Sequence, residues 1–152
     1  MEVLYMLKSI FKWLLGTLLL LQVIQIKVPS IPNSLDSNIE IKAPKEIVKI
    51  LKTSCYDCHS YQTKTPWYGH IAPISWEVKS HIKFGRKALN FQEWQNYDAN
   101  KKQKLYKKIV QTITFRMPLP MYLVVHKEAR LKREQREQIS LWAKSHIKEE
   151  EY

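Results

Sequence analysis

Two cysteines and a histidine lie close together in the chain, and their spacing limits the chemistry they can do. The segment reads Cys55-Tyr56-Asp57-Cys58-His59, and it holds both cysteines of the 152-residue sequence. Thiols at this spacing on a tight turn can reach the two vinyl groups along one edge of a porphyrin, and the adjacent imidazole then lies under the ring. Haem iron accepts histidine as its proximal ligand. The pattern predicts a single covalent haem c, attached through Cys55 and Cys58, with His59 on the iron.

Other uses of a C-x-x-C pair remain open, but they match the sequence less well. Thioredoxin-like redox chemistry is expected near a βαβ unit, and no alternating strand pattern is present. A zinc site needs four ligands, and without further cysteines two would have to come from distant histidines. The histidines outside the motif are His70, His81, His126 and His146. Chance occurrence of the motif is the remaining alternative.

A second axial ligand is expected if the haem is a low-spin electron carrier. Met117 and Met121 are the only methionines beyond the apolar N-terminal segment. Met117 precedes Pro118, which restricts the backbone of its neighbour and can hold a weak ligand in place. A thioether ligand raises the reduction potential. We predict Met117 as the distal ligand and keep as alternatives an open site or ligation by Met121, His70, His81 or His126.

Three further side chains are candidates for contacts with the cofactor. Arg86 can pair with a haem propionate, because guanidinium groups bind carboxylates in a bidentate manner. Trp67 and Tyr68 can line the crevice or donate hydrogen bonds to a propionate. A solvated Arg86 and ordinary core roles for the two aromatic residues are equally compatible with the sequence.

The first 28 residues differ in character from the rest. Lys8 and Lys12 precede the apolar run from Trp13 to Leu21, and the largely apolar stretch from Ile10 to Val28 is just long enough to cross a bilayer. No small-x-small cleavage site is evident, which favours an uncleaved signal-anchor over a removed signal peptide or a buried core helix. Because lysines flanking such a segment stay in the cytoplasm, we predict a single-pass protein of the bacterial inner membrane with its C-terminal part in the periplasm.

The remaining chain divides into a linker over residues 29–43 and a domain over residues 44–148. The linker is rich in proline, serine and asparagine. The domain carries apolar residues at helical spacing, and its fold class is predicted to be all-α, a small helical domain after an N-terminal transmembrane helix; the resemblance described below implies that this domain is cytochrome-c-like. We expect a helix from Pro44 to the cysteines, one opened by Pro73 and stopped at Gly85, a turn capped by Asn90, and helices over 99–115 and 132–147.

The formal net charge of +11 favours anionic partners. No basic helix lies beside a recognisable DNA-reading motif, so we expect no nucleic-acid partner. The lysines are either solvated helix faces or a docking surface for an acidic redox partner protein.

Several short blocks resemble the bacterial haem-binding domain family, a cytochrome-c-like group with one C-x-x-C-H motif. Besides the motif, the matching blocks are Thr65-Pro66-Trp67-Tyr68, Ile71-Ala72-Pro73-Ile74-Ser75-Trp76, Gly85-Arg86, Leu89-Asn90-Phe91 with Trp94, Met117-Pro118, Tyr122, His126 and Ala129-Arg130-Leu131. The resemblance covers about residues 45 to 145 and implies covalent haem, export and a helical fold. Met121, which follows Met117 closely, is a departure that leaves the ligand choice open.

Together these features predict a one-electron carrier rather than an enzyme. The iron would cycle between its ferric and ferrous states, with no residue acting as acid, base or nucleophile. A haem-based sensor with an open or displaceable sixth site is the main alternative. A peroxidase-like enzyme would need a distal base and an arginine, for which His81 and Arg86 are an imaginable pair.

Overall fold

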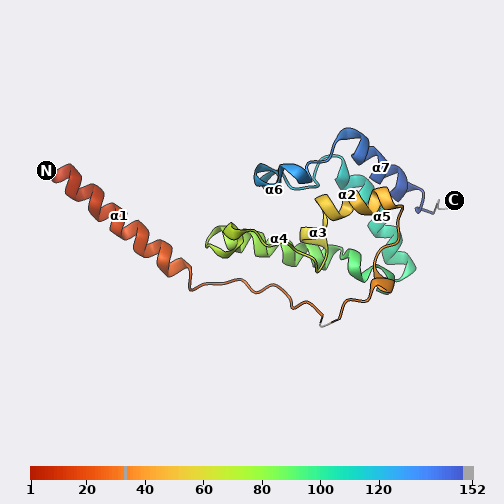
Figure 1. Cartoon of the computed structure of the whole chain (residues 1–152), viewed down its shortest axis with the longest axis horizontal. Coiled ribbons are helices and arrows are strands. Elements are labelled where there is room, and N and C mark those ends of the chain that lie inside the picture. The colour runs from red at the N-terminus through yellow and green to blue at the C-terminus, as the bar shows by residue number, and fades with distance from the viewer. Residues whose placement is uncertain (33, 149–152) are drawn as a thin grey trace.

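A computed structural model describes residues 1–32 and 34–148 of the chain. Within these ranges the protein is helical and contains no β-strand, which confirms the all-α prediction. A long N-terminal helix, α1, projects from a bundle of shorter helices (Figure 1). The elements are α1 (Glu2–Leu21), η1 (Ser37–Ile39), α2 (Lys45–Ser54), α3 (Tyr56–His59), η2 (Trp67–His70), α4 (Ile74–Ala88), η3 (Phe91–Asn96), α5 (Ala99–Ile113), α6 (Pro120–Val125), η4 (Lys127–Ala129) and α7 (Arg133–Lys144).

Helix α1 is long and apolar enough to cross a membrane, and none of its residues is buried in the protein. Twenty helical residues extend about 30 Å, which matches the hydrocarbon thickness of a bilayer. The helix begins at Glu2 and ends at Leu21, whereas the apolar stretch of the sequence continues to Val28. Beyond the end of the helix, Gln22, Ile24 and Gln25 bind the folded domain, as described below.

The end of the predicted linker is part of the domain core. Ile41 is buried, and its backbone N–H donates to the Phe91 carbonyl at 2.8 Å. Asp36 caps the short 3₁₀ turn η1 by accepting a hydrogen bond from the backbone of Asn38. Residue 33 of the linker lies outside the described residues.

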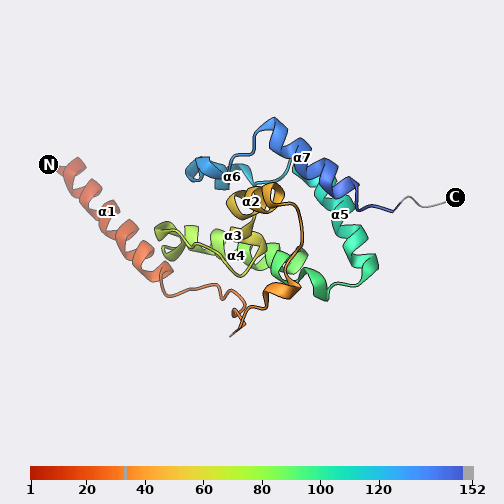
Figure 2. The same ribbon diagram turned by 45° about the vertical axis from the view of Figure 1, so that its right-hand side comes forward.

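Helices α2, α5 and α7 pack together around an apolar core (Figures 1 and 2). Leu105, Ile109 and Ile113 repeat every four residues along α5 and are all buried, as their helical spacing predicts. Ile139 of α7 is fully buried against them. These helices form the scaffold that carries the cysteine motif at the end of α2.

The residues predicted to begin helices mostly do so, whereas the residue predicted to end α4 does not. Pro73 immediately precedes α4, and Asn90 caps η3 by accepting from the backbone N–H of Gln92 at 3.0 Å. Gly85 does not end α4, which continues to Ala88. The proline-rich break after α5 holds an unexpected short helix, α6, because Pro120 occupies its first turn, where proline is favoured.

Candidate functional site

The cysteine motif forms a tight helical turn at the end of α2. Helix α2 stops at Ser54, and the backbone N–H groups of Cys58 and His59 both donate to the Cys55 carbonyl, at 3.2 and 3.0 Å. Both cysteines are free thiols and are partly exposed. The turn therefore presents two thiols and an imidazole from one rigid piece of backbone.

The imidazole of His59 is fixed by the last turn of α4. Its Nδ1 lies 3.1 Å from the Gly85 carbonyl oxygen and 3.0 Å from that of Leu89. Both oxygens can only accept, so Nδ1 carries the hydrogen and Nε2 keeps its lone pair. Burial lowers the pKa of His59, although the two carbonyl contacts oppose that shift. The ring is thus held in the neutral form with the tautomer that an iron ligand needs.

The position of Gly85 explains why α4 can approach this turn so closely. A Cβ atom at Gly85 would lie 2.4 Å from the carbonyl oxygen of Cys58 and 3.1 Å from its Cβ. The closest obstacle is backbone, which cannot rotate away as a side chain would. The glycine is needed for close packing against the motif, and this replaces its predicted role as a helix stop.

The two residues between the cysteines anchor the turn to other parts of the domain. Tyr56 is buried, stacks on Phe91 with ring centroids 5.4 Å apart, and donates to the Glu40 carboxylate at 2.6 Å. Asp57 accepts from the Tyr122 hydroxyl at 2.7 Å and from the backbone of Lys64 at 3.0 Å. A motif search treats these two positions as variable, so sequence reasoning missed their roles.

The guanidinium group of Arg86 is hydrogen-bonded to the loop that follows the motif. Its Nε donates to the Ser60 carbonyl at 2.8 Å, and one terminal nitrogen donates to the Thr63 hydroxyl at 3.0 Å. The guanidinium group also lies 5.3 Å from the ring centre of Tyr61. The structure therefore gives Arg86 a loop-holding role, and propionate binding by it stays a prediction.

Tyr68 is held by a residue from the far end of the sequence. The hydroxyl of Tyr68 donates to Nε2 of His126 at 2.6 Å, while Nδ1 of His126 faces the Glu128 carboxylate at 3.0 Å. The His126 ring also stacks on Tyr122, with centroids 4.2 Å apart. The side chain of Trp67, which precedes Tyr68 in the sequence, is 76% exposed. Through Tyr122 this polar cluster connects to Asp57 inside the motif.

The loop of Met117 is tied to α7. Arg136 donates to the carbonyl oxygens of Ile113 and Met117, the latter at 2.7 Å, while the backbone of Met117 donates to Thr112 at 3.0 Å. Met117 is partly buried, and Met121 is 76% exposed. The order of the Met117 loop thus depends on Arg136, and the choice of distal ligand stays a prediction.

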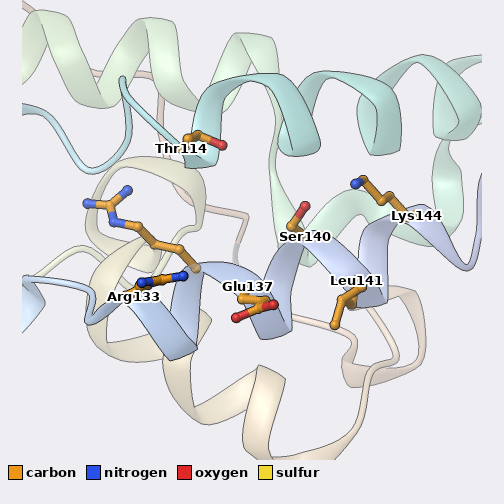
Figure 3. A pocket seen from close by; sticks show the side chains of 7 residues that line it. Thr114, Arg133, Glu137, Ser140, Leu141 and Lys144 are labelled. Atoms are coloured by element: carbon orange, nitrogen blue, oxygen red, sulfur yellow. The ribbon is translucent and has the colours of Figure 1, made fainter.

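A hollow in the surface lies beside this loop, between the end of α5 and one face of α7 (Figure 3). It is lined by Thr114, Arg133, Arg136, Glu137, Ser140, Leu141 and Lys144. Neither the cysteines nor His59 line the hollow, but the charge of Arg136, which does line it, acts to lower the pKa of Cys55.

The surroundings of the thiols disfavour dithiol redox chemistry. Burial, reinforced by the neighbouring thiol, raises the pKa of Cys55 to about 12, and burial with Asp57 raises that of Cys58 to about 11. Reactive redox cysteines have lowered pKa values instead. Among residues 1–32 and 34–148, no group of three or more Cys, His, Asp or Glu side chains is placed to hold a metal ion.

The two thiols and the imidazole of the motif are side chains that can bind haem. Two thiols on one turn, with an adjacent imidazole whose Nδ1 is bonded to protein carbonyls, define a helical protein of the haem-binding class. The model of the haem-binding domain family matches residues 16–145. The chain belongs to this family and binds haem, as the resemblance predicts. No curated protein and no solved structure matches it significantly.

Proposed function

We propose that the protein is a membrane-tethered c-type haem protein that carries single electrons. Its haem is attached through Cys55 and Cys58, with His59 as the proximal ligand. The observation that supports this best is the pair of hydrogen bonds from His59 Nδ1 to the Gly85 and Leu89 carbonyls. Bonds of this kind orient a ligating histidine and increase its basicity. When bound, the haem supplies the reversible one-electron couple of its iron.

In this proposal the chain itself binds the cofactor, fixes its ligands and excludes water. The α4 carbonyls stop rotation of the His59 ring, and the packing of Gly85 against Cys58 keeps the turn in register with α4. Met117 supplies the distal thioether, with its loop held by Arg136. No residue acts as acid, base or nucleophile, so we propose no enzymatic activity.

The proposed location is the periplasmic face of the bacterial inner membrane. Helix α1 is apolar enough to span a bilayer, and Lys8 and Lys12 precede its most apolar part, residues 13–21. The positive-inside rule then keeps this end in the cytoplasm and exports the haem domain. Covalent haem attachment outside the cytoplasm agrees with this orientation.

The proposed partner is an acidic redox protein that docks on exposed lysines of the domain. Exposed lysines of α5, such as Lys104 and Lys108, contribute to the net charge of +11. Exchanging both for glutamate should slow electron exchange with an anionic reagent and weaken its salt dependence. The same exchange at Lys45 and Lys49 of α2 is the matched control. Equal effects from both pairs would mean that the attraction is not localised on α5.

The direct test of covalent attachment is a pyridine haemochrome spectrum. The full chain is expressed with the haem-maturation machinery, denatured and extracted with acidified organic solvent. We expect the haem to stay with the polypeptide and the spectrum to report two thioether bonds. Loss of haem into the solvent contradicts covalent attachment, while the haem-binding assignment stands.

A haem-based sensor is the second candidate, and the polar cluster beside the motif favours it. Tyr68, Tyr122 and His126 are hydrogen-bonded together with Asp57, and polar groups near a haem help to decide ligand binding. Carbon monoxide added to the reduced protein separates the candidates. An unchanged spectrum supports the carrier, and rapid binding supports the sensor.

A further inference from the structure

The segment that follows α1 lies along α4 and is not a free tether. The side-chain amide of Gln22 accepts a hydrogen bond from the backbone N–H of Ala72 at 2.9 Å and donates to the carbonyl of the same residue at 3.1 Å. The indole N–H of Trp76 donates to the Ile24 carbonyl at 2.6 Å. We call residues 22–29 the strap.

The contacts continue in register toward the other end of α4. Lys79 Nζ donates to the side-chain oxygen of Gln25 at 2.6 Å, and Arg86 donates to the Pro29 carbonyl at 3.2 Å. From Trp76 to Arg86, α4 covers about 15 Å at its helical rise, and the strap from Ile24 to Pro29 covers about 17 Å if extended. The matching lengths allow the two segments to run side by side over the length of the helix.

This register brings the beginning of α4 next to the end of the membrane helix. Gln22 directly follows Leu21, the last residue of α1, so Ala72 lies within one side chain's length of that end. Both views show the start of α4 beside the C-terminal end of α1, with α6 on the same side of the domain (Figures 1 and 2). The domain therefore presents one defined end to the membrane.

That end of the domain is unusually apolar. From η2 and the start of α4 it exposes Trp67 (76%), Ile71 (42%) and Ile74 (53%). From α6 it exposes Met121 (76%), Val124 (63%) and Val125 (57%). The two groups come from adjacent elements, because the hydrogen bond between Tyr68 and His126 joins η2 to the end of α6. We call these six residues the apolar end.

We propose that the strap holds the haem domain against the bilayer, with the apolar end inserted at the boundary of lipid headgroups and acyl chains. The proposal rests on the membrane span proposed above for α1. Tryptophan is enriched at this boundary, and exposed apolar side chains gain free energy when they leave water there. If it stayed in water, exposed apolar surface of this kind would favour aggregation. The haem domain would thus have a fixed orientation to the membrane, and partners would approach the side away from it.

Photocrosslinking to lipid in the full-length, haem-loaded protein tests this proposal. A benzoylphenylalanine replaces Ile74 or Val124, and the protein is reconstituted in vesicles of phosphatidylethanolamine and phosphatidylglycerol. Irradiation should give lipid adducts at both positions, detected by mass spectrometry. The matched control is the same probe at Leu141, which is 60% exposed on α7. We expect severalfold less lipid adduct there.

The strap is tested by changing its contacts while the domain core is left intact. Gln22→Ala combined with Trp76→Phe removes the three hydrogen bonds that these two side chains make between the strap and the domain, and we expect severalfold less lipid adduct at position 74. Unchanged adduct yield in this variant overturns the role of the strap.

A probe inside α1 separates failure of this proposal from failure of the proposed membrane span. If Leu18 gives lipid adducts while positions 74 and 124 give no more than 141, the domain is anchored but not docked, and the proposal is wrong. If position 18 also gives none, the membrane span fails with it. Crosslinking of 74 and 124 to haem or to a protein, in place of lipid, also overturns the proposal.

Discussion

Substitution of Gly85 by alanine tests whether close packing on α4 positions His59, the proposed haem ligand. An added Cβ would lie 2.4 Å from the Cys58 carbonyl oxygen, which is too close for any real contact. In an exposed helix the same change would gain about 1 kcal/mol from helix propensity. Overpacking a tight contact costs about 1 to 3 kcal/mol, and a backbone obstacle favours the upper part of that range.

We therefore expect Gly85→Ala to destabilise the domain by about 1 to 2 kcal/mol, which lowers its Tm by about 5 to 10 °C. Because α4 has to move away from the motif, the two hydrogen bonds to His59 should lengthen and the visible spectrum of the haem should change. Thermal unfolding followed by circular dichroism, together with the absorption spectrum, measures both effects in the full chain.

Gly69→Ala is the matched control. A Cβ at Gly69 would meet the methyl group of Thr65 at 2.9 Å and Val78 at 3.4 Å, and both neighbours are side-chain atoms that can shift. We expect a loss below about 1 kcal/mol and an unchanged haem spectrum. A Gly85→Ala protein that is as stable as the wild type or more stable, with the same spectrum, would refute the packing argument.

Three further outcomes follow from the structure. In the haem-free protein, Cys55 should be alkylated about a thousandfold more slowly at pH 8 than in urea, because a pKa raised from 9.0 to about 12 depletes the thiolate. Its rate should still rise about tenfold per pH unit above pH 9, where an ordinary thiol levels off. Arg136→Gln should cost about 1.5 to 3 kcal/mol in chemical unfolding and weaken the long-wavelength absorption band of a Met117-ligated ferric haem. Ile139→Ala, at a fully buried position, should cost about 2 to 5 kcal/mol without changing that band.

Local patterns in the sequence were sufficient to predict the helices that form the scaffold. The spacing of Leu105, Ile109 and Ile113 predicts the buried face of α5, and Asn90 predicts the cap of η3. Such features depend on residues within one or two helical turns, so they can be read without knowing the fold. The C-x-x-C-H motif is equally local, and the family match supports the haem-binding prediction made from it.

Features that depend on contacts between distant segments were missed or misread. Gly85 looks like a helix stop in the sequence, but its role comes from Cys58, which lies 2.4 Å from its added Cβ position. The roles of Asp57 and Tyr122 depend on a hydrogen bond across 65 positions of sequence. Nothing in the local pattern around either residue specifies its partner, so only the folded structure shows the contact.

The surroundings of His59 combine a local motif with a contact between distant segments. A helix leaves its last carbonyl groups without partners inside the helix, and they carry the negative end of its dipole. The carbonyl of Leu89, the residue that follows α4, and the carbonyl of Gly85, which also accepts from the Leu89 backbone N–H, both meet Nδ1 of His59, so the end of the helix fixes the imidazole. In the proposed ligation, the hydrogen bonds to these oxygens would make Nε2 of His59 a stronger donor and would favour ferric iron. A distal thioether at Met117 would act in the opposite direction, so the reduction potential of the protein should reflect the balance between α4 on one side and the Met117 loop on the other.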